Sequence, residues 1–174
     1  MKIVILQENL KSALFQLQKA IPSKPQLPIL ASVLLSATKT DLSFSATDLY
    51  FGIRTRVMAQ VTDPTTVAVP AEIFKQLVGS LPAGQVELIT TETNLTIKTA
   101  TTKAQIPLQN GTEFPQFPDV AGTQIEFSAT EIQTIVTQTS YANSTDVSRP
   151  VLTALLFNFQ ETSLEVVGTD GFRL

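Results

Sequence analysis

The sequence repeats itself at an interval of 122 residues without a gap. Shifting the chain by that interval aligns apolar positions, a proline and a Thr-Asp pair in one order. The matched pairs are Ile3 with Ile125, Ile5 with Phe127, Leu10 with Ile132, Leu14 with Val136, Pro28-Ile29-Leu30 with Pro150-Val151-Leu152, Leu34 with Leu156, Leu42 with Leu164, and Thr47-Asp48 with Thr169-Asp170. Periodicity alone gives some of these matches, but the ungapped register favours true duplication. One unit of 122 residues is therefore followed by the opening part of a second.

Short alternating segments rich in Val, Ile, Thr and Phe predict a protein dominated by antiparallel strands. The predicted strands cover residues 2–7, 32–38, 41–47, 50–61, 65–69, 85–90, 94–99, 102–108, 124–128, 153–160 and 163–168. Turns are expected at Lys39-Thr40, Glu92-Thr93 and Glu161-Thr162.

Three segments have the helical period instead. The first runs from an N-cap at Asn9 to about Ile21, the second from Pro70 to Gly79, and the third from a cap at Ser128 or Thr130 to Tyr141. Their apolar stripes predict which side chains face a sheet. Those residues are Leu10, Leu14, Leu17, Ile73, Phe74, Leu77, Ile132, Ile135 and Val136.

Within the first 120 residues, a strand, a helix and three strands follow one another twice. This order predicts an α+β fold, a domain of two βαβββ units with antiparallel sheets and the helices on one face. We expect one continuous sheet outside, with the polar sides of both helices turned the same way. Residues 110–118 contain two prolines and no period, which is typical of a linker. The predicted domains are residues 1–120, which are complete, and 121–174, which are partial.

The composition argues against an enzyme. The chain has no cysteine and no histidine, which excludes disulfides, thiolate zinc sites and nucleophiles activated by histidine. The carboxylates are scattered singly, so we expect no catalytic residues, no metal and no cofactor. No apolar run approaches the roughly 20 residues of a membrane span, and Glu8 interrupts the apolar start, which predicts a cytoplasmic location without a membrane partner.

Five segments, in chain order, match one known family. They are MKIVILQENL at the start, Lys24-Pro25-Gln26-Leu27-Pro28-Ile29-Leu30, Ala46-Thr47-Asp48-Leu49, Arg149-Pro150-Val151-Leu152-Thr153, and Thr169-Asp170-Gly171-Phe172-Arg173-Leu174. The ordered set resembles the bacterial DNA polymerase III beta subunit family, the sliding clamps of replication.

The resemblance implies a processivity factor, not an enzyme. In that family three such domains form half of a ring, two chains close head to tail, and twelve helices line a hole around duplex DNA. The third domain would be absent from this chain. The implied partners are duplex DNA bound without sequence preference, the polymerase III catalytic subunit, the clamp loader, other proteins with clamp-binding motifs and a second copy, in the nucleoid of the cytoplasm.

The resemblance also implies a DNA-facing loop at Lys24 and a corresponding loop at Arg149. For Lys24 the alternative is an ordinary solvated lysine, and the family position favours the DNA-facing interpretation. Arg149 is equally consistent with a residue that fixes its loop or borders a peptide cleft. Lys11, Lys19 and Lys75 lie off the apolar stripes of their helices. Solvated helix surface is their default interpretation, and contact with phosphate is the alternative. The net charge of −3 does not indicate a nucleic-acid partner, so any contact of these lysines with DNA would depend on local charge.

A hydrophobic cleft for partner peptides is the second site that the resemblance implies. Its positions in this chain are Leu152, Thr169, Gly171, Phe172, Arg173 and Leu174. Glycine permits a tight turn, leucines offer apolar wall, and arginine binds peptide carbonyls or carboxylates. Phe172 stands where a histidine is common in the family. The alternative is that Leu152 belongs to the hydrophobic core and that Thr169-Asp170-Gly171 is an ordinary turn.

Two other classes of protein remain open from the residues alone. A structural β protein whose repeats serve self-assembly explains the acidic charge and the duplication, but not the order of the loop motifs. A hydrolase that uses carboxylates needs two acids converging in one pocket, and no pair in the sequence is placed to do so.

Overall fold

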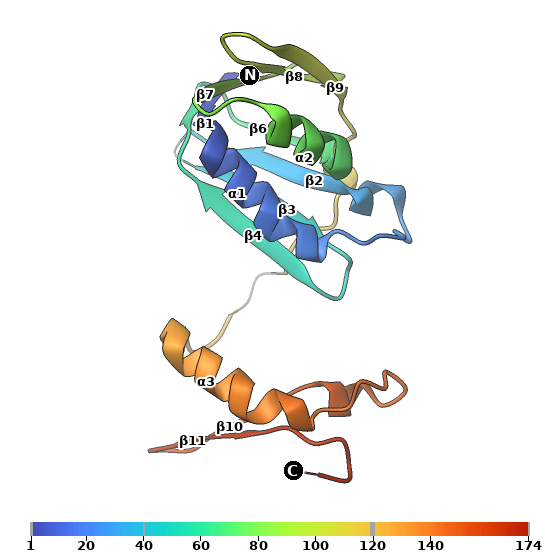
Figure 1. Cartoon of the computed structure of the whole chain (residues 1–174), viewed down its shortest axis with the longest axis vertical. Helices are drawn as coiled ribbons and strands as arrows, with labels where there is room; N and C mark the ends of the chain where they lie inside the picture. Colours follow the sequence, from blue (N-terminus) through green and yellow to red (C-terminus); the bar gives the residue numbers. More distant parts are fainter. Residues whose placement is uncertain (1, 40, 119–120, 174) are drawn as a thin grey trace. The chain divides into compact units, whose positions relative to one another are not determined.

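The computed structural model describes residues 2–39, 41–118 and 121–173. The chain divides into two compact units, Met1–Asp119 and Val120–Leu174, which are described separately (Figure 1).

Unit 1 contains the predicted pair of strand–helix–strand series. The first half comprises β1 (Lys2–Leu6), α1 (Gln7–Leu17), β2 (Ser32–Ala37), β3 (Leu42–Thr47), β4 (Gly52–Val57) and the short β5 (Gln60–Val61). The second half comprises β6 (Thr65–Pro70), α2 (Ala71–Ser80), β7 (Gln85–Thr90), β8 (Asn94–Lys98) and β9 (Lys103–Pro107). The α+β class and the antiparallel pairing are confirmed.

The two halves exchange their first strands. One sheet has the order β5-β1-β7-β8-β9 and the other the order β4-β3-β2-β6, so β1 pairs with the second half and β6 with the first. Ile3 lies opposite Leu88, and Leu34 lies opposite Ala68. The expected single sheet is therefore wrong: the strands form two sheets, which a bridge between Ala68 and Gln109 connects. Unfolding of either half would therefore remove a strand from the sheet of the other half.

Both helices cover the same side of these sheets (Figure 1). Leu10, Leu14 and Leu17 of α1 are buried, as are Phe74 and Val78 of α2, and the rings of Phe74 and Phe44 lie 6.4 Å apart. The inward position predicted for Ile73 is wrong, because its side chain is 52% exposed. The buried stripe of α2 runs instead through Ala71, Phe74 and Val78, at the spacing of one helix face.

The start of α1 also differs from the prediction. The helix begins at Gln7, directly after β1, and no side chain caps it, so the cap assigned to Asn9 is wrong. Gln7 is buried, and its Nε2 donates to the carbonyl of Val78 at 3.0 Å. The backbone N–H of Gln7, at the start of α1, donates to the carbonyl of Gly84 at 2.8 Å.

Residues 110–118 are not a linker but part of unit 1. Gly111–Glu113 forms a 3-10 turn, and Phe114, 3% exposed, packs with Ile29, Leu30 and Ala68. Phe117 lies under the guanidinium of Arg54, whose Cζ is 4.8 Å from the ring centroid. A side chain at Gly52 would collide with that ring. Aromatic residues spaced along a proline-rich segment are the feature that the linker interpretation overlooked.

Unit 2 reproduces the first half of unit 1 at the interval of 122 residues. Its elements are α3 (Ala129–Thr139), a 3-10 turn at Ser140–Ala142, another at Pro150–Thr153, and the hairpin of β10 (Leu156–Phe159) and β11 (Leu164–Val167). The helix, both 3-10 turns and β11 begin 122 residues after their counterparts in unit 1. The strand β10 begins two residues later than that interval places the start of β2. Ser128 caps α3 in a capping box with Glu131, which selects Ser128 over Thr130.

The described part of unit 2 corresponds to the first half of unit 1 only. The strand predicted at 124–128 is absent, because β1 is held between β5 and β7 and no described residue of unit 2 takes their place. The inward positions predicted on α3 are likewise not buried: Ile132 is 39% and Val136 44% exposed. Their counterparts Leu10 and Leu14 are buried.

The turns at Glu92-Thr93 and Glu161-Thr162 lie between paired strands as predicted, while Thr40 of the third turn lies outside the described residues. Among the described helices, none has the length and apolar character needed to cross a membrane.

Candidate functional site

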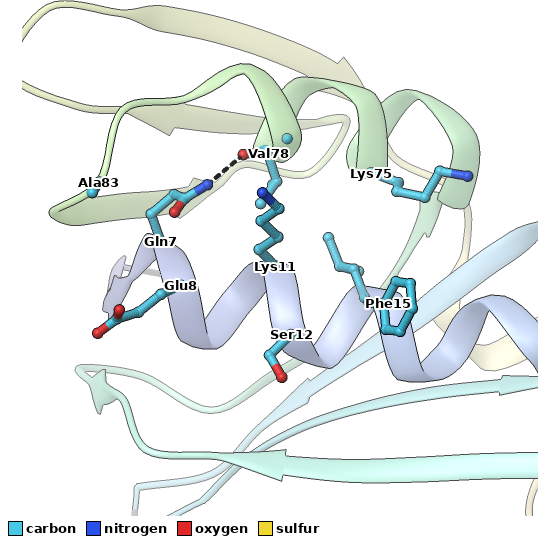
Figure 2. Close-up of a pocket in the computed structure, with 10 residues that line it drawn as sticks. Gln7, Glu8, Lys11, Ser12, Phe15, Lys75, Val78 and Ala83 are labelled. Atoms are coloured by element: carbon cyan, nitrogen blue, oxygen red, sulfur yellow. Dashed lines mark hydrogen bonds between the residues drawn. The ribbon is translucent and has the colours of Figure 1, made fainter.

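The polar face of α1 and α2 carries two of the four cations singled out in unit 1, Lys11 and Lys75. The helices lie side by side, and a groove of about 570 Å³ runs between them (Figure 2). Lys11 of α1 and Lys75 of α2 both line this groove. Lys19 is exposed in the 3-10 turn that follows α1, and Lys24 is exposed in the loop after it, so neither borders the groove.

The cations of this face differ in how freely they can meet an anion. Lys75 lies 3.3 Å from the carboxylate of Glu72 one turn earlier. The Gln76 amide, which donates to Glu72 at 2.8 Å, and then Lys75 hold the pKa of Glu72 below its ordinary value, so this acid stays charged beside Lys75. Within the described chain, Lys11, Lys19 and Lys24 form no ion pair. These three ammonium groups are the ones available to an external anion.

Phe15 is the groove residue that the sequence reasoning missed. Its side chain is 72% exposed, although it is a large aromatic residue in the middle of α1. It stands four positions after Lys11, so the two side chains project from the same face of α1, and Lys19 follows in the 3-10 turn after the helix. An aromatic residue off the buried stripe and flanked by lysines was the available signal.

The cations are not repeated in unit 2. The positions 122 residues beyond Lys11, Lys19 and Lys24 are Gln133, Tyr141 and Asp146. Asp146 accepts from the N–H and the hydroxyl of Ser148, and these bonds lower the pKa of Asp146. A carboxylate therefore stands in unit 2 where unit 1 has an ammonium group.

Arg149 is exposed in unit 2, before the 3-10 turn Pro150–Thr153. Its carbonyl accepts from the N–H of Leu152 at 3.0 Å, the same contact that Leu27 makes with Leu30 in unit 1. The backbone of Arg149 thus fixes the loop, and its guanidinium forms no ion pair with any described residue.

The predicted cleft residues follow a turn that occurs in both units. Thr169 Oγ1 accepts from the N–H of Gly171 and donates to the carbonyl of Arg173, while Asp170 accepts from the N–H groups of Phe172 and Arg173. Thr47 and Asp48 make the same four hydrogen bonds to Leu49, Tyr50 and Phe51. The third residue has a positive φ in each case, 90° at Gly171 and 81° at Leu49.

This turn brings part of the predicted cleft together. A Cβ added to Gly171 would lie 4.0 Å from Cδ1 of Leu152, so the leucine borders the glycine turn. Phe172 is fully exposed. The Nε of Arg173 lies 3.0 Å from the carboxylate of Asp170, which ties the guanidinium to the loop. Leu174 lies outside the described residues.

No group of three acidic side chains in the described part of the chain is placed to hold a metal ion.

Three comparisons with known proteins point the same way. The family described as "DNA polymerase III beta subunit, N-terminal domain" matches residues 1–118. The chain is 33% identical over 178 residues to the beta sliding clamp of Synechococcus elongatus and 31% identical over 176 residues to that of Chlamydia muridarum. Both matches cover 100% of this chain and 48% of the relative.

Solved structures of sliding clamps share the fold. The clamp of Caulobacter crescentus superimposes with a TM-score of 0.89 at 30% identity, over 98% of this chain and 48% of that one. The clamp of Bacillus subtilis gives a TM-score of 0.91 at 22% identity, over 98% of this chain and 47% of that one, which shows the fold alone. The chain spans about half the length of the relatives that it matches.

Proposed function

The chain belongs to the DNA polymerase III beta subunit family, a family of non-catalytic subunits in DNA replication, and we propose that it forms the amino-terminal part of a sliding clamp. The match of residues 1–118 to the N-terminal domain of that family carries the proposal. Residues 1–120 then form one complete clamp domain, and residues 121–174 form the opening half of a second.

We infer that retention on DNA is topological. A closed ring leaves DNA only at an end or by opening, so it stays bound even when each contact is weak. The net charge of −3 supports this mechanism, because an acidic chain gains little from long-range attraction to phosphate. In this proposal a second copy completes the ring, a clamp loader opens it, and the polymerase catalytic subunit is its main partner.

The polar face of α1 and α2 is the surface that we assign to DNA. Lys11 lies on this face, and Lys19 and Lys24 are exposed in the segment that follows α1. None of the three has an ion pair to any described residue. Exposed cations bind phosphates in a salt-dependent way and without regard to sequence, which suits a protein that must slide. Lys75, paired with Glu72, contributes less. Arg149 of unit 2 is a further phosphate ligand in this proposal.

Charge removal tests this assignment. Neutralising Lys11, Lys19 and Lys24 to glutamine is expected to lower the slope of log K against log salt for duplex DNA by about 0.9 for each phosphate that the protein no longer binds. The matched control is Lys39→Gln, an exposed lysine in the turn between β2 and β3. The assignment is rejected if the salt slope falls as much in Lys39→Gln as in the triple variant, or if it falls in neither. Lys24→Glu alone is expected to weaken binding without unfolding unit 1.

The peptide cleft is the second proposed surface. In this proposal Leu152, which borders the Gly171 turn, and the exposed Phe172 supply the apolar wall, and Arg173, paired with Asp170, supplies the charge. Polymerase and other proteins with clamp-binding motifs would dock there. Replacing Leu152 with Ala is expected to weaken binding of a clamp-binding peptide in a fluorescence-polarisation titration of a clamp that carries these residues. Unchanged affinity would remove Leu152 from the cleft.

A further inference from the structure

The groove between α1 and α2 has the chemistry of a binding site as well as of a charged surface. Its floor includes the apolar side chains of Leu14 and Val78, and Phe15 stands at its edge. Figure 2 shows Lys11 extending from α1 toward α2, and Lys75 extending from α2 on the side of Phe15. Two ammonium groups from two helices thus border an apolar depression with an exposed ring.

The depression is open and of a useful size. Its volume of about 570 Å³ lies within the range of roughly 300–1,000 Å³ that is usual for ligand sites. Gly79 and Ala83 form part of its wall, and a Cβ at Gly79 would meet no other atom within 4 Å. No bulky side chain therefore fills this end. Glu8 is the acidic residue of the lining, and Figure 2 shows its side chain pointing away from α2.

A ligand for this groove must combine a flat apolar group with negative charge. A nucleotide within a single strand does so, because its base offers a π-face and its flanking phosphates offer anions. Aromatic platforms beside cations bind single strands in this way. Duplex DNA cannot use the ring in the same manner, since neighbouring bases cover each base face.

We propose that the α1–α2 groove binds an unpaired base of single-stranded DNA, stacked on Phe15, with a neighbouring phosphate at Lys11 and a weaker contribution from Lys75, which is paired with Glu72. The proposal rests on the proposed function, because it takes the helix face to be turned toward DNA. It adds a second mode of contact: duplex DNA meets the lysines alone, whereas a single strand also meets the ring. The site belongs to unit 1 only, since Thr137 and Gln133 stand where Phe15 and Lys11 would recur.

The chain offers an unusually clean probe of stacking, because it contains no tryptophan. Phe15→Trp places one indole in the groove at an exposed position. We expect its fluorescence to fall on titration with oligothymidylate at low salt, and to stay constant with an abasic oligonucleotide of the same length or with duplex DNA. The matched control is Tyr50→Trp, because Tyr50 is 91% exposed in a loop of the same unit away from the groove.

Affinity provides the second readout. Phe15→Ala is expected to weaken oligothymidylate binding by about 5- to 150-fold, the effect of losing one stacked base. The same variant should leave duplex binding unchanged, whereas Lys11→Gln should weaken both. Circular dichroism checks that each variant is folded.

The outcomes separate the two proposals. Indole fluorescence at position 15 that does not respond to oligothymidylate, or that responds equally at position 50, overturns the stacking site. Equal binding of oligothymidylate by the wild type and by Phe15→Ala overturns it as well. Neither result bears on duplex binding by Lys11, Lys19 and Lys24. If replacing those lysines leaves the salt dependence of duplex binding unchanged, the proposed DNA face is rejected, but a base-dependent signal at Phe15 would still stand.

Discussion

Single residues determine the backbone conformation at the turns of this fold. Gly84 has a φ of +133°, and its carbonyl accepts from the N–H of Gln7 at the start of α1. Gly79 lies in α2 with no positive φ. A Cβ would meet no atom within 4 Å at either position, so the two glycines differ only in their backbone conformation.

This contrast gives a matched pair of substitutions. Gly84→Ala is expected to destabilise unit 1 by about 1 kcal/mol or more, because an L side chain disfavours that φ. Gly79→Ala is expected to stabilise it by about 0.5 kcal/mol through helix propensity. Urea denaturation measures both. Effects of the same sign would show that φ is not what distinguishes the two sites.

The Thr-Asp turn predicts a dependence on pH. The N–H groups of Phe51 and then Tyr50 lower the pKa of Asp48 from its ordinary 3.8. Since the folded value is the lower one, the carboxylate stabilises the turn above about pH 3.8, and this contribution is lost as the pH falls through the folded pKa. Asp48→Asn keeps an accepting oxygen but does not titrate. Melting temperatures between pH 7 and 2.5 should therefore fall less steeply for this variant, and parallel curves would contradict the linkage.

At the scale of elements, the buried positions of a helix were predictable where a single face of the helix packs against the sheets. Leu10, Leu14 and Leu17 recur at helical spacing and are all buried. Ile73 could not be excluded by periodicity, since Ile73 and Leu77 are four positions apart, which is also the spacing of one helix face. The start of α1 was also beyond local rules, because the backbone N–H of Gln7 finds its acceptor at Gly84, far along the chain.

Leu14→Asp tests the packing of α1 on the sheets. The substitution places an unpaired carboxylate in the core of unit 1, at a cost of about 5 kcal/mol or more, which is comparable to the whole stability of a domain. We expect loss of the folded far-ultraviolet dichroism. Ser12→Asp, on the exposed side of the same helix, is the control and should fold. A folded Leu14→Asp protein would refute the assignment of the buried face.

At the scale of the molecule, strand exchange explains why the two units differ. Each half of unit 1 completes a sheet of the other, whereas the described part of unit 2 corresponds to the first half alone. The sequence predicted the repeat and the class of fold from aligned apolar positions. It did not predict the exchange, because an alternating strand pattern specifies which face is buried but not which strand is the neighbour.

Hydrogen exchange should reveal the difference between the units. In a protein of residues 1–174 alone, amides of α3 are expected to have protection factors at least about tenfold lower than those of α1, although the helices occupy matching positions in the repeat. Native-state exchange followed by mass spectrometry compares them in one sample. Equal protection would mean that α3 is covered in solution.

The candidate site was predictable in part. Helical spacing identified Lys11 and Lys75 as residues off the apolar stripes, and the structure brings them to one groove. Phe15 was not singled out, because an exposed aromatic residue has no periodic signature. The Asp146 carboxylate, opposite in charge to Lys24 at the matching position, becomes meaningful only when the two copies are compared.

Retention on circular DNA tests the central claim most directly. Residues 1–174 would replace the matching half of the Caulobacter crescentus clamp, and the dimeric chimaera would be loaded onto nicked circular DNA by its clamp loader with ATP. The measured quantity is the fraction of protein that stays with DNA before and after linearisation. Topological tethering predicts retention on circles and rapid loss from linear ends. Equal retention on both forms, or none on either, would contradict the clamp.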